Sequence, residues 1–561
     1  MRTITMLTLL TLAAGAIQAQ DISGDWLGTL SAGGAELRLA LHITKSIDGS
    51  FSGTMDSLDQ GANGIPLSSI ALKDSKLTLS VDAVHGTYEG TVNAAGSSIS
   101  GNWSQGQSLP LEFKRGAVKK AAIAPPSDID GAWMGTLDAG AAKLRLVFHF
   151  TNTADGLTAT MDSPDQGVKG IPVNVTRKDA SLKIEMKQAH GSYDGTIDKD
   201  LQTIKGTWTQ GGKTFPVVLK RVKDSAELAD PVRPQNPTKP YPYRSEDVTY
   251  TNPVAHIQLA ATFTIPEGKG PFPAVVLITG SGPQDRDETL MGHKPFLVLS
   301  DYLTRHGVAV LRADDRGIGK SGGQFTGATT ADFATDAEAS LAYLKARPEA
   351  DPHKLGLIGH SEGAMIAPMV AARNHDVAFI VMLAGPGVPG DQILLEQGKL
   401  IMAAGGMSAE DIDKQQAPNR DAFALIRSEQ DGPALDKQLH DLLAREVPPA
   451  ELDQELKSLN SPWFRYFLRY DPAVALRKVT CPVLALNGEK DLQVPPAQNL
   501  PAVRAALREA GNKHFEADEM PGLNHLFQTA KTGSPSEYSH IEETLSPNAL
   551  KKVADWINSL S

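Results

Sequence analysis

Residues 355–373 read LGLIGHSEGAMIAPMVAAR, and this stretch decides the fold of the second half of the chain. An apolar run of strand type ends in the pentapeptide GHSEG (359–363), and a run with helical spacing follows it. The two glycines permit the tight strand-to-helix turn that pushes a strained serine out of a sheet. The N-terminus of the following helix favours developing negative charge. We therefore expect Ser361 to act as a nucleophile.

A serine hydroxyl is a weak nucleophile, so it needs a base, and the base needs an orienting acid. LALNGEKDLQVPP (484–496) offers Asp491 just after an apolar strand, and FEADEMPGLNHLF (515–527) offers His525 in a loop after the last strand. This order of serine, acid and histidine suits a nucleophile on a strand-to-helix turn. Other residues of the right types are Glu489 and Asp391 for the acid, and His514 and His540 for the base.

Apolar runs of strand type alternate with helical patterns on both sides of this serine. The runs are 257–266, 273–282, 308–315, 354–360, 378–385 and 482–488, and the helical patterns include 294–307 and 329–348. Such alternation predicts a mostly parallel sheet with helices on both faces.

The segment VAVLRADDRGIGKSGGQF (308–325) resembles a nucleotide site, because it contains G-x-G-x-x-G and Gly-Lys-Ser. A phosphate-binding loop would need glycine at the position of Asp314. The dinucleotide fingerprint would need a helix that starts within the glycines and an acid at the end of the next strand, but Asp336 and Glu338 fall inside a helical pattern. Nucleotide binding is therefore not expected.

Taken together, residues from about 247 to 561 resemble the α/β-hydrolase superfamily, in the branch of bacterial acyl hydrolases near the serine aminopeptidases and dienelactone-hydrolase-like esterases. Asp315-Arg316-Gly317-x-Gly319-x-Ser321 is similar to a D-R-G-x-G-x-S turn of that superfamily. The resemblance implies an acid role for Asp491 and a base role for His525. The implied mechanism needs neither a metal nor an organic cofactor.

Two preorganised N–H donors are needed to hold an oxyanion. We expect one to be the backbone N–H of Glu362, and the other to be that of Ser281, with Gly282 as the alternative. The superfamily often has His-Gly near Ser281, where this chain has Thr279-Gly280. His360 is expected to be a packing neighbour. Asp285, Arg286 and Asp287 could line the pocket, but a solvated loop is the favoured interpretation.

A helical cap is predicted at about 388–475, between two strands of the sheet, where it would exclude water and select substrates. Its segment SPWFRYFLRYDP (461–472) is rich in aromatic residues. Trp463, Phe464, Tyr466 and Phe467 could form an acyl-pocket wall or the seam that docks the cap on the sheet.

The N-terminal half contains two copies of one module, at 20–116 and 117–222. Both open with Gly-x-Trp and share MDS-x-DQG-x-x-GIP. Short runs with alternating polarity predict all-β, barrel-like modules, and Gly-x-Trp resembles the lipocalin type. The shared segment could be a ligand rim or a turn that closes the barrel. Trp103 and Trp208 are expected in the cores, and the spacing around His85 and His190 does not suit a metal.

Residues 1–19 have the pattern of a secretory signal peptide, too short for a membrane span, and 223–246 form a Pro-rich linker. The formal net charge is -11 without basic clusters, which argues against nucleic acid. The single cysteine, Cys481, lies in an apolar run and is expected to be a buried strand residue. We expect an exported protein, periplasmic or extracellular, without stable membrane insertion.

Three functions remain open at this point. The first is a secreted serine hydrolase for carboxylic esters. The second is an exopeptidase for short peptides, which would need an acidic group in the cap, where Glu446, Glu451 and Glu455 stand. The third is a protein whose β modules bind a glycan or cell-surface partner beside a degenerate hydrolase half.

Overall fold

The structure is a computed structural model that describes residues 21–560 with short gaps. The gaps are 33–34, 47–49, 59–61, 82–85, 106, 117–124, 139–142, 154–155, 167, 187–190, 211–212, 225–227, 229–231 and 446–448. The signal peptide predicted over 1–19 lies outside the described residues, as do His85, His190 and Glu446. The chain divides into two compact units, Met1–Ala122 and Ile123–Ser561.

The first unit is one antiparallel sheet in the order β4-β3-β2-β1-β9-β8-β7-β6-β5. Its end strands β4 and β5 are consecutive in the chain, and Leu67 and Ser68 join them. The Leu67 N–H donates to Gly53 O in β3, and the Ser68 N–H donates to Ser80 O in β6. The sheet therefore curls into a barrel-like shape around a strand broken at these two residues. The strands are β1 Gly24–Ala32, β2 Ala35–Lys45, β3 Phe51–Ser57, β4 Ala62–Pro66, β5 Ser69–Lys73, β6 Lys76–Val81, β7 Gly86–Val92, β8 Ser98–Gln105 and β9 Gln107–Arg115.

The second module, in the other unit, is a closed barrel of strands β10 to β17 in chain order. Its strand β13 is unbroken and pairs with both β12 and β14. The two modules are thus all-β and barrel-like, as the sequence predicts. The strands are β10 Gly131–Asp138, β11 Lys143–Thr153, β12 Gly156–Ser163, β13 Val168–Lys178, β14 Ser181–Met186, β15 Gly191–Ile197, β16 Thr203–Gln210 and β17 Lys213–Arg221.

The Gly-x-Trp tryptophans occupy equivalent places in the two cores. Both are fully buried, and each lies under the guanidinium of the arginine that ends its module. The Arg115 guanidinium lies 4.4 Å from the ring centre of Trp26, and that of Arg221 lies 4.5 Å from that of Trp133. These stacks close one end of each module with a cation–aromatic contact. Trp103 and Trp208 are also buried and belong to the cores.

The aspartate of the shared MDS segment lies near the end of a strand in both modules, β3 in the first and β12 in the second. Asp56 Oδ1 accepts from the Gly64 N–H at 2.6 Å, and Asp162 Oδ1 accepts from the Gly170 N–H at 2.7 Å. Each carboxylate thus ties the end of its strand to the strand that follows, β4 or β13. These bonds favour a structural role over a ligand rim.

One histidine pair distinguishes the two copies. His42 lies between two carboxylates, with Nδ1 2.8 Å from Asp25 Oδ1 and Nε2 3.0 Å from Asp56 Oδ2. Its counterpart His149 contacts Asp162 alone. The hydrogen bond to Asp25 is the main cause that raises the pKa of His42, against partial burial.

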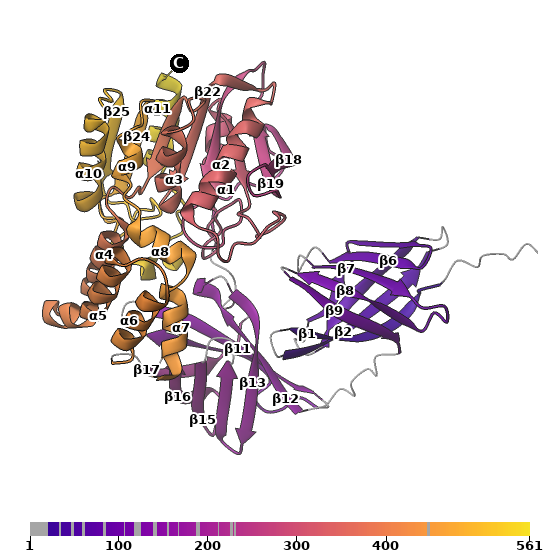
Figure 1. The fold of residues 1–561 in the computed structure, drawn as a ribbon. Helices are drawn as coiled ribbons and strands as arrows, with labels where there is room; N and C mark the ends of the chain where they lie inside the picture. Colours follow the sequence, from indigo (N-terminus) through magenta and orange to yellow (C-terminus); the bar gives the residue numbers. More distant parts are fainter. Residues whose placement is uncertain are drawn as a thin grey trace, which may run out of the picture. The chain divides into compact units, whose positions relative to one another are not determined.

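The C-terminal part of the chain forms an eight-stranded sheet in the order β18-β19-β21-β20-β22-β23-β24-β25. The first two pairings are antiparallel and the others are parallel. In Figure 1 these strands run from magenta to yellow. The bounds are β18 Arg244–Asn252, β19 Ile257–Ile265, β20 Phe272–Ile278, β21 Ala309–Ala313, β22 Ala350–His360, β23 Phe379–Leu383, β24 Val483–Gly488 and β25 Phe515–Met520.

Helices cover both faces of this sheet. One core joins the sheet to α2 Thr330–Lys345, α3 Glu362–Ala371, α9 Ala473–Leu476 and α10 Pro496–Glu509. The other joins it to α1 Pro295–Arg305 and α11 Pro547–Ser559. Cys481 lies two residues before β24 and is half-buried, so the expectation of a buried strand residue is wrong. It packs against the first core, and partial burial raises the pKa of the thiol to about 11. This arrangement is the α/β-hydrolase fold expected from the sequence.

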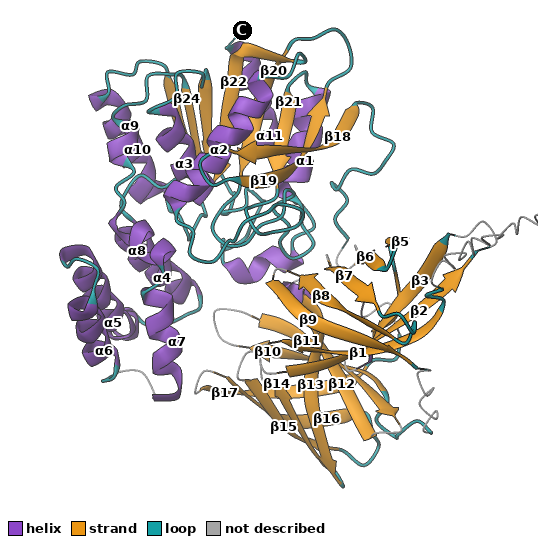
Figure 2. Ribbon diagram, turned by 45° about the vertical axis from the view of Figure 1, so that its right-hand side comes forward, coloured by secondary structure: helices purple, strands orange, loops and turns teal. Residues whose placement is uncertain are grey.

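Five helices between β23 and β24 form a cap with its own apolar cluster. They are α4 Gly390–Ala404, α5 Ala409–Ser428, α6 Pro433–Leu443, α7 Pro449–Leu459 and α8 Pro462–Arg469. Figure 2 shows the loops that follow the parallel strands, in teal, gathered at one edge of the sheet, with the cap helices on that side. None of the helices in the described part of the chain combines the length and apolar character needed to cross a bilayer.

Candidate active site

Ser361 occupies the strained turn between β22 and α3. Its backbone has φ 53° and ψ -115°, a left-handed conformation that costs a non-glycine residue about 1–3 kcal/mol. A Cβ on Gly359 would overlap the Gly363 carbonyl, and a Cβ on Gly363 would overlap those of Ile278 and Thr279. Both glycines of GHSEG are therefore needed for the close approach of strand and helix.

His525 and Asp491 are bound to each other at the same edge of the sheet. His525 Nδ1 lies 2.9 Å from Asp491 Oδ2 and 3.1 Å from Oδ1. Asp491 is 1% exposed, and its Oδ1 also accepts from the N–H groups of Gln493 and Val494 at 2.9 and 2.8 Å. The acid is thus held by backbone donors while it orients the imidazole, as in acid–histidine pairs that activate a serine.

Ser361 and His525 line one pocket of about 360 Å³. Neither the Ser361 hydroxyl nor His525 Nε2 has a hydrogen-bond partner among the described residues. Both groups are therefore free to act on a molecule in the pocket. The apolar part of the lining comes mainly from Leu290, Ile393, Leu394, Trp463, Phe467, Val494 and Leu526.

The loop after β20 carries the second backbone N–H that the sequence predicts for an oxyanion site. The Gly280 N–H donates to Glu288 Oε1 at 2.8 Å, so it is already used. Within the described chain, the N–H groups of Ser281 and Glu362 have no partner, and both residues line the pocket with Ser361. Gly282, the alternative donor, has φ 98° and does not line this pocket. A helix N-terminus leaves its first N–H groups unpaired, which explains the free donor at Glu362.

His360, the residue before Ser361, is tied on both sides. Its Nδ1 lies 2.9 Å from Glu288 Oε1, and its Nε2 lies 3.1 Å from the His525 carbonyl. Burial works against the charge of His360, but Glu288 outweighs it and raises the pKa. His360 thus holds the loop of His525 through its backbone carbonyl and is a packing neighbour of the site, as predicted. No motif or spacing in the sequence points to Glu288.

The Glu362 side chain fastens the cap. Its Oε1 accepts from Thr330 Oγ1 at 2.6 Å and from Trp463 Nε1 at 2.8 Å. Burial raises the pKa of Glu362, and these two bonds oppose that shift. A buried carboxyl beside the nucleophile therefore connects helix α2, helix α8 and the turn.

The aromatic segment of α8 divides between the two roles considered for it. Trp463 and Phe467 line the pocket and stack on each other, with ring centres 5.3 Å apart. Phe464 packs into the cap cluster, and Tyr466 packs against the core of the sheet. The segment is both a pocket wall and a docking seam, because successive side chains of a helix point in different directions.

The other acids and histidines considered from the sequence do not line this pocket. Glu489 accepts from the Gly522 N–H at 2.7 Å, and Asp391 pairs with Arg427 on the cap. His540 Nδ1 lies 2.9 Å from Ser539 Oγ, and His514 directly precedes β25. The described residues contain no group of three His, Cys, Asp or Glu side chains able to hold a metal ion.

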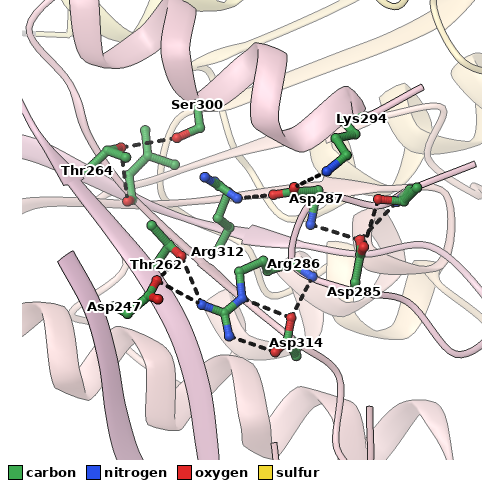
Figure 3. Close-up of polar contacts among 12 residues, drawn as sticks. Asp247, Thr262, Thr264, Asp285, Arg286, Asp287, Lys294, Ser300, Arg312 and Asp314 are labelled. Atoms are coloured by element: carbon green, nitrogen blue, oxygen red, sulfur yellow. Dashed lines mark hydrogen bonds and ion pairs between the residues drawn. The ribbon is translucent and has the colours of Figure 1, made fainter. Parts of the chain in front are cut away.

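The expectation of a solvated loop at 285–287 is wrong. Figure 3 shows Arg286 bound to Asp314, with Nη2 2.7 Å from Oδ2, and Asp287 bound to Arg312 and Lys294. The Arg286 side chain is 14% exposed. The sequence of this segment suggests an exposed loop, because the partners of its charges lie elsewhere in the chain. Arg312 lies in β21, Asp314 directly follows it, and Lys294 precedes α1.

The glycines at 317–323 serve this same network rather than a phosphate. Gly317 and Gly319 have φ 74° and 55°, and a Cβ on Gly319 would overlap the Asp314 carboxylate. The Lys320 N–H donates to Asp314 Oδ2 at 3.0 Å. The turn thus wraps a buried aspartate. The neighbouring Asp315 binds Thr279 Oγ1 at 2.7 Å, and its burial raises its pKa to about 7.

Known proteins resemble the part of the chain that carries this site. The family model described as X-Pro dipeptidyl-peptidase (S15 family) matches residues 256–516. Esterase EstD of Thermotoga maritima is 28% identical over 373 residues, which are 65% of this chain and 79% of that protein. An esterase of Pyrococcus furiosus covers 59% of this chain and 98% of its own, at 16% identity and a TM-score of 0.36. Est1E from Butyrivibrio proteoclasticus covers 56% and 98% at 15% identity and a TM-score of 0.33. By its topology and its likeness to the peptidase family and to the Thermotoga esterase, the C-terminal part of this chain is an α/β hydrolase of the serine hydrolase kind, and two all-β modules precede it.

Proposed function

We propose that the protein hydrolyses carboxylic esters through an acyl-enzyme formed on Ser361. The observation that carries the proposal is the strained serine that shares a pocket with the free Nε2 of an aspartate-bound histidine. Ser361 Oγ attacks the ester carbonyl carbon and passes its proton to His525 Nε2. Asp491 keeps the Nδ1–H oriented and stabilises the imidazolium that results.

The oxyanion forms where the N–H groups of Ser281 and Glu362 converge. Collapse of the tetrahedral intermediate breaks the bond to the alcohol oxygen, which takes the proton from His525. Water then attacks the acyl-enzyme and gives a proton to His525. The bond from the acyl carbon to Ser361 Oγ breaks, Oγ takes the proton back from His525, and the carboxylic acid leaves. The apolar lining from α4 and α8 favours an uncharged acyl group.

An exopeptidase is the second candidate, because the matching family model is that of a peptidase. Amine recognition would need a carboxylate that is free inside the pocket. The two acids of the lining, Glu288 and Glu362, are bound to His360 and to Thr330 and Trp463. Glu455 is exposed on α7 and does not line the pocket, while the side chains of Glu446 and Glu451 lie outside the described residues. These contacts favour an ester substrate over a peptide substrate.

A labelling experiment tests the nucleophile. Ser361→Ala should abolish covalent labelling by a fluorophosphonate and leave only a small residual rate of ester hydrolysis. Ser428→Ala, which removes an exposed hydroxyl on the cap, is the control and should label normally. Labelling of Ser361→Ala at the wild-type rate would refute the assignment.

A substrate panel then separates the two candidate functions. p-Nitrophenyl esters of increasing acyl length are compared with aminoacyl and X-Pro p-nitroanilides under the same conditions. We expect a higher kcat/KM for esters, and the reverse order would select the peptidase. Export through residues 1–19, and a glycan or cell-surface ligand for the β modules, complete the proposal. Fractionation with N-terminal sequencing and a glycan array are their tests.

A further inference from the structure

The segment between the second β module and the sheet lies against the hydrolase and enters it at Arg233. This residue is buried, although its charge would be expected at the surface of a linker. Its Nη1 donates to Ile541 O at 2.8 Å, and its Nη2 donates to Ser539 O at 2.8 Å and to Met291 O at 2.9 Å. One guanidinium thus joins two loops that lie about 250 positions apart in the sequence.

Gln235, two residues after Arg233, extends the same contact. Its Nε2 donates to Leu545 O at 2.7 Å, and its Oε1 accepts from the Leu545 N–H at 3.1 Å and from the Thr544 N–H. The side-chain amide therefore pairs with the backbone as a neighbouring strand would. Arg233 and Gln235 together hold residues 539–545 at four backbone positions.

The segment 538–546 in turn contacts both loops that carry the proposed acid and base. Gln493, two residues after Asp491, donates from Nε2 to Tyr538 Oη at 2.9 Å. The Ser546 N–H donates to Phe527 O, two residues after His525, at 2.8 Å. A displacement of this segment would therefore reach Asp491 and His525 through one hydrogen bond each.

The loop of Met291 leads to the other side of the site. His293, which is fully buried, bridges Thr544 Oγ1 at 2.9 Å and the Tyr538 carbonyl at 3.0 Å. Five residues earlier, Glu288 binds the Gly280 N–H at the start of the oxyanion loop. The loops of the acid–histidine pair and of the oxyanion donors are thus both connected to backbone segments that Arg233 binds.

Arg233 binds backbone carbonyls and does not form a hydrogen-bonded ion pair among the described residues. No carboxylate is hydrogen-bonded to it among the described residues, and its Nε is buried without a partner. Charged donors make stronger hydrogen bonds to carbonyls than neutral ones, and burial keeps water from competing. Glu542 favours the charge electrostatically, but within the described part of the chain only the three carbonyls are hydrogen-bonded to the guanidinium.

We propose that Arg233 and Gln235 are positioning residues, through which the chain before the sheet clamps the loops of Asp491, His525 and the oxyanion donors. The inference rests on the proposed function of those residues. It makes the segment from residue 232 onward part of the catalytic domain. Removal of the β modules together with this segment would then damage the active site, whether or not the modules themselves contribute.

The test uses the full chain with Arg233→Ala, Gln235→Ala and the control Arg244→Ala. Arg244 is a matched arginine a few residues on, but its side chain is 58% exposed and pairs with Glu246 and Glu349 at the sheet edge. We expect kcat on a p-nitrophenyl ester to fall about 10- to 100-fold in the two clamp variants, since small displacements of catalytic groups cost that much. KM should stay within about twofold, because neither Arg233 nor Gln235 lines the pocket.

Guanidinium at non-denaturing concentration should restore part of kcat to Arg233→Ala, and to neither Gln235→Ala nor Arg244→Ala. Thermal unfolding of each variant gives the folded fraction, to which kcat is normalised. Unchanged kcat, or a loss equal to the unfolded fraction, would overturn the clamp. If Arg233→Ala does not fold, Gln235→Ala carries the same test. Ser361→Ala is measured in parallel, so full activity there would reject the proposed function and not the clamp.

Discussion

Replacement of Gly363 by alanine should separate the two sides of the oxyanion site. A Cβ at this position would overlap the Ile278 carbonyl oxygen and lie 2.6 Å from that of Thr279, whereas real contacts of this kind stay above 3.0 Å. Both carbonyls belong to rigid backbone at the end of β20, so the first turn of α3 has to move instead. That movement takes the Glu362 N–H away from the Ser281 N–H.

The expected magnitude follows from the size of this overlap. Relief requires a shift of several tenths of an ångström to about 1 Å, which can cost about 100-fold in rate when it misplaces catalytic groups. Overpacking of a close contact also costs about 1–3 kcal/mol of stability. We therefore expect kcat for a p-nitrophenyl ester to fall about 100-fold, with a lower unfolding temperature in a protein that still folds.

Gly322→Ala is the matched control, because its Cβ would meet no atom closer than 3.4 Å, at the Gln258 carbonyl, and its φ is not positive. Steady-state kinetics, fluorophosphonate labelling and thermal unfolding are measured for both variants. If Gly363→Ala keeps kcat within about twofold of the wild type, the close approach of strand and helix does not set the site, and the reasoning fails.

Three further outcomes are expected. Asp491→Asn should reduce kcat by several orders of magnitude, about 10⁴-fold in the best-studied case of this change, with KM little altered in steady-state kinetics. Trp463→Phe keeps the ring but loses the bond to the Glu362 carboxylate, a bond type worth about 1.5–3 kcal/mol. It should lower kcat/KM and the unfolding temperature, and an unchanged protein would show that the cap is held elsewhere. The pKa of His42 is raised on folding, so its contribution to stability is complete below pH 6.5 and is lost as the pH rises through the folded value. Hydrogen exchange of β2 peptides should therefore speed up with rising pH in excess of the chemical rate in the wild type, but not in His42→Asn.

The strained turn at Ser361 and the fold around it could be predicted from sequence because local rules determine them. A strand, two glycines around a serine and a helix leave one compact arrangement, and the alternation of apolar runs and helices predicts a mostly parallel sheet covered on both faces. The tandem modules were equally accessible, since alternation and repetition specify the class of structure. One local property could not be predicted: the fourth strand of the first module is split at Leu67 and Ser68 into β4 and β5.

The rest of the site depends on contacts between distant segments, which carry no local pattern. Glu288 and Arg233 are charged residues in irregular chain, and only the folded structure reveals that each is buried. The charges at 285–287 looked solvated for the same reason. Trp463 was recognised as an aromatic candidate, but its bond to Glu362 joins residues 101 positions apart. Pairing of that kind cannot be inferred from either segment alone.

The split between β4 and β5 gives the two β modules different weak points. In the second module, β13 runs without a break from the residues that pair with β12, 168–173, to those that pair with β14, 174–178. In the first module, the strand is interrupted at Leu67 and Ser68, where the backbone bonds change from β3 to β6. Local opening starts where few backbone bonds must break together. Two copies with nearly the same interior should therefore melt from different places, and heat or pulling force should unzip the first copy along this line.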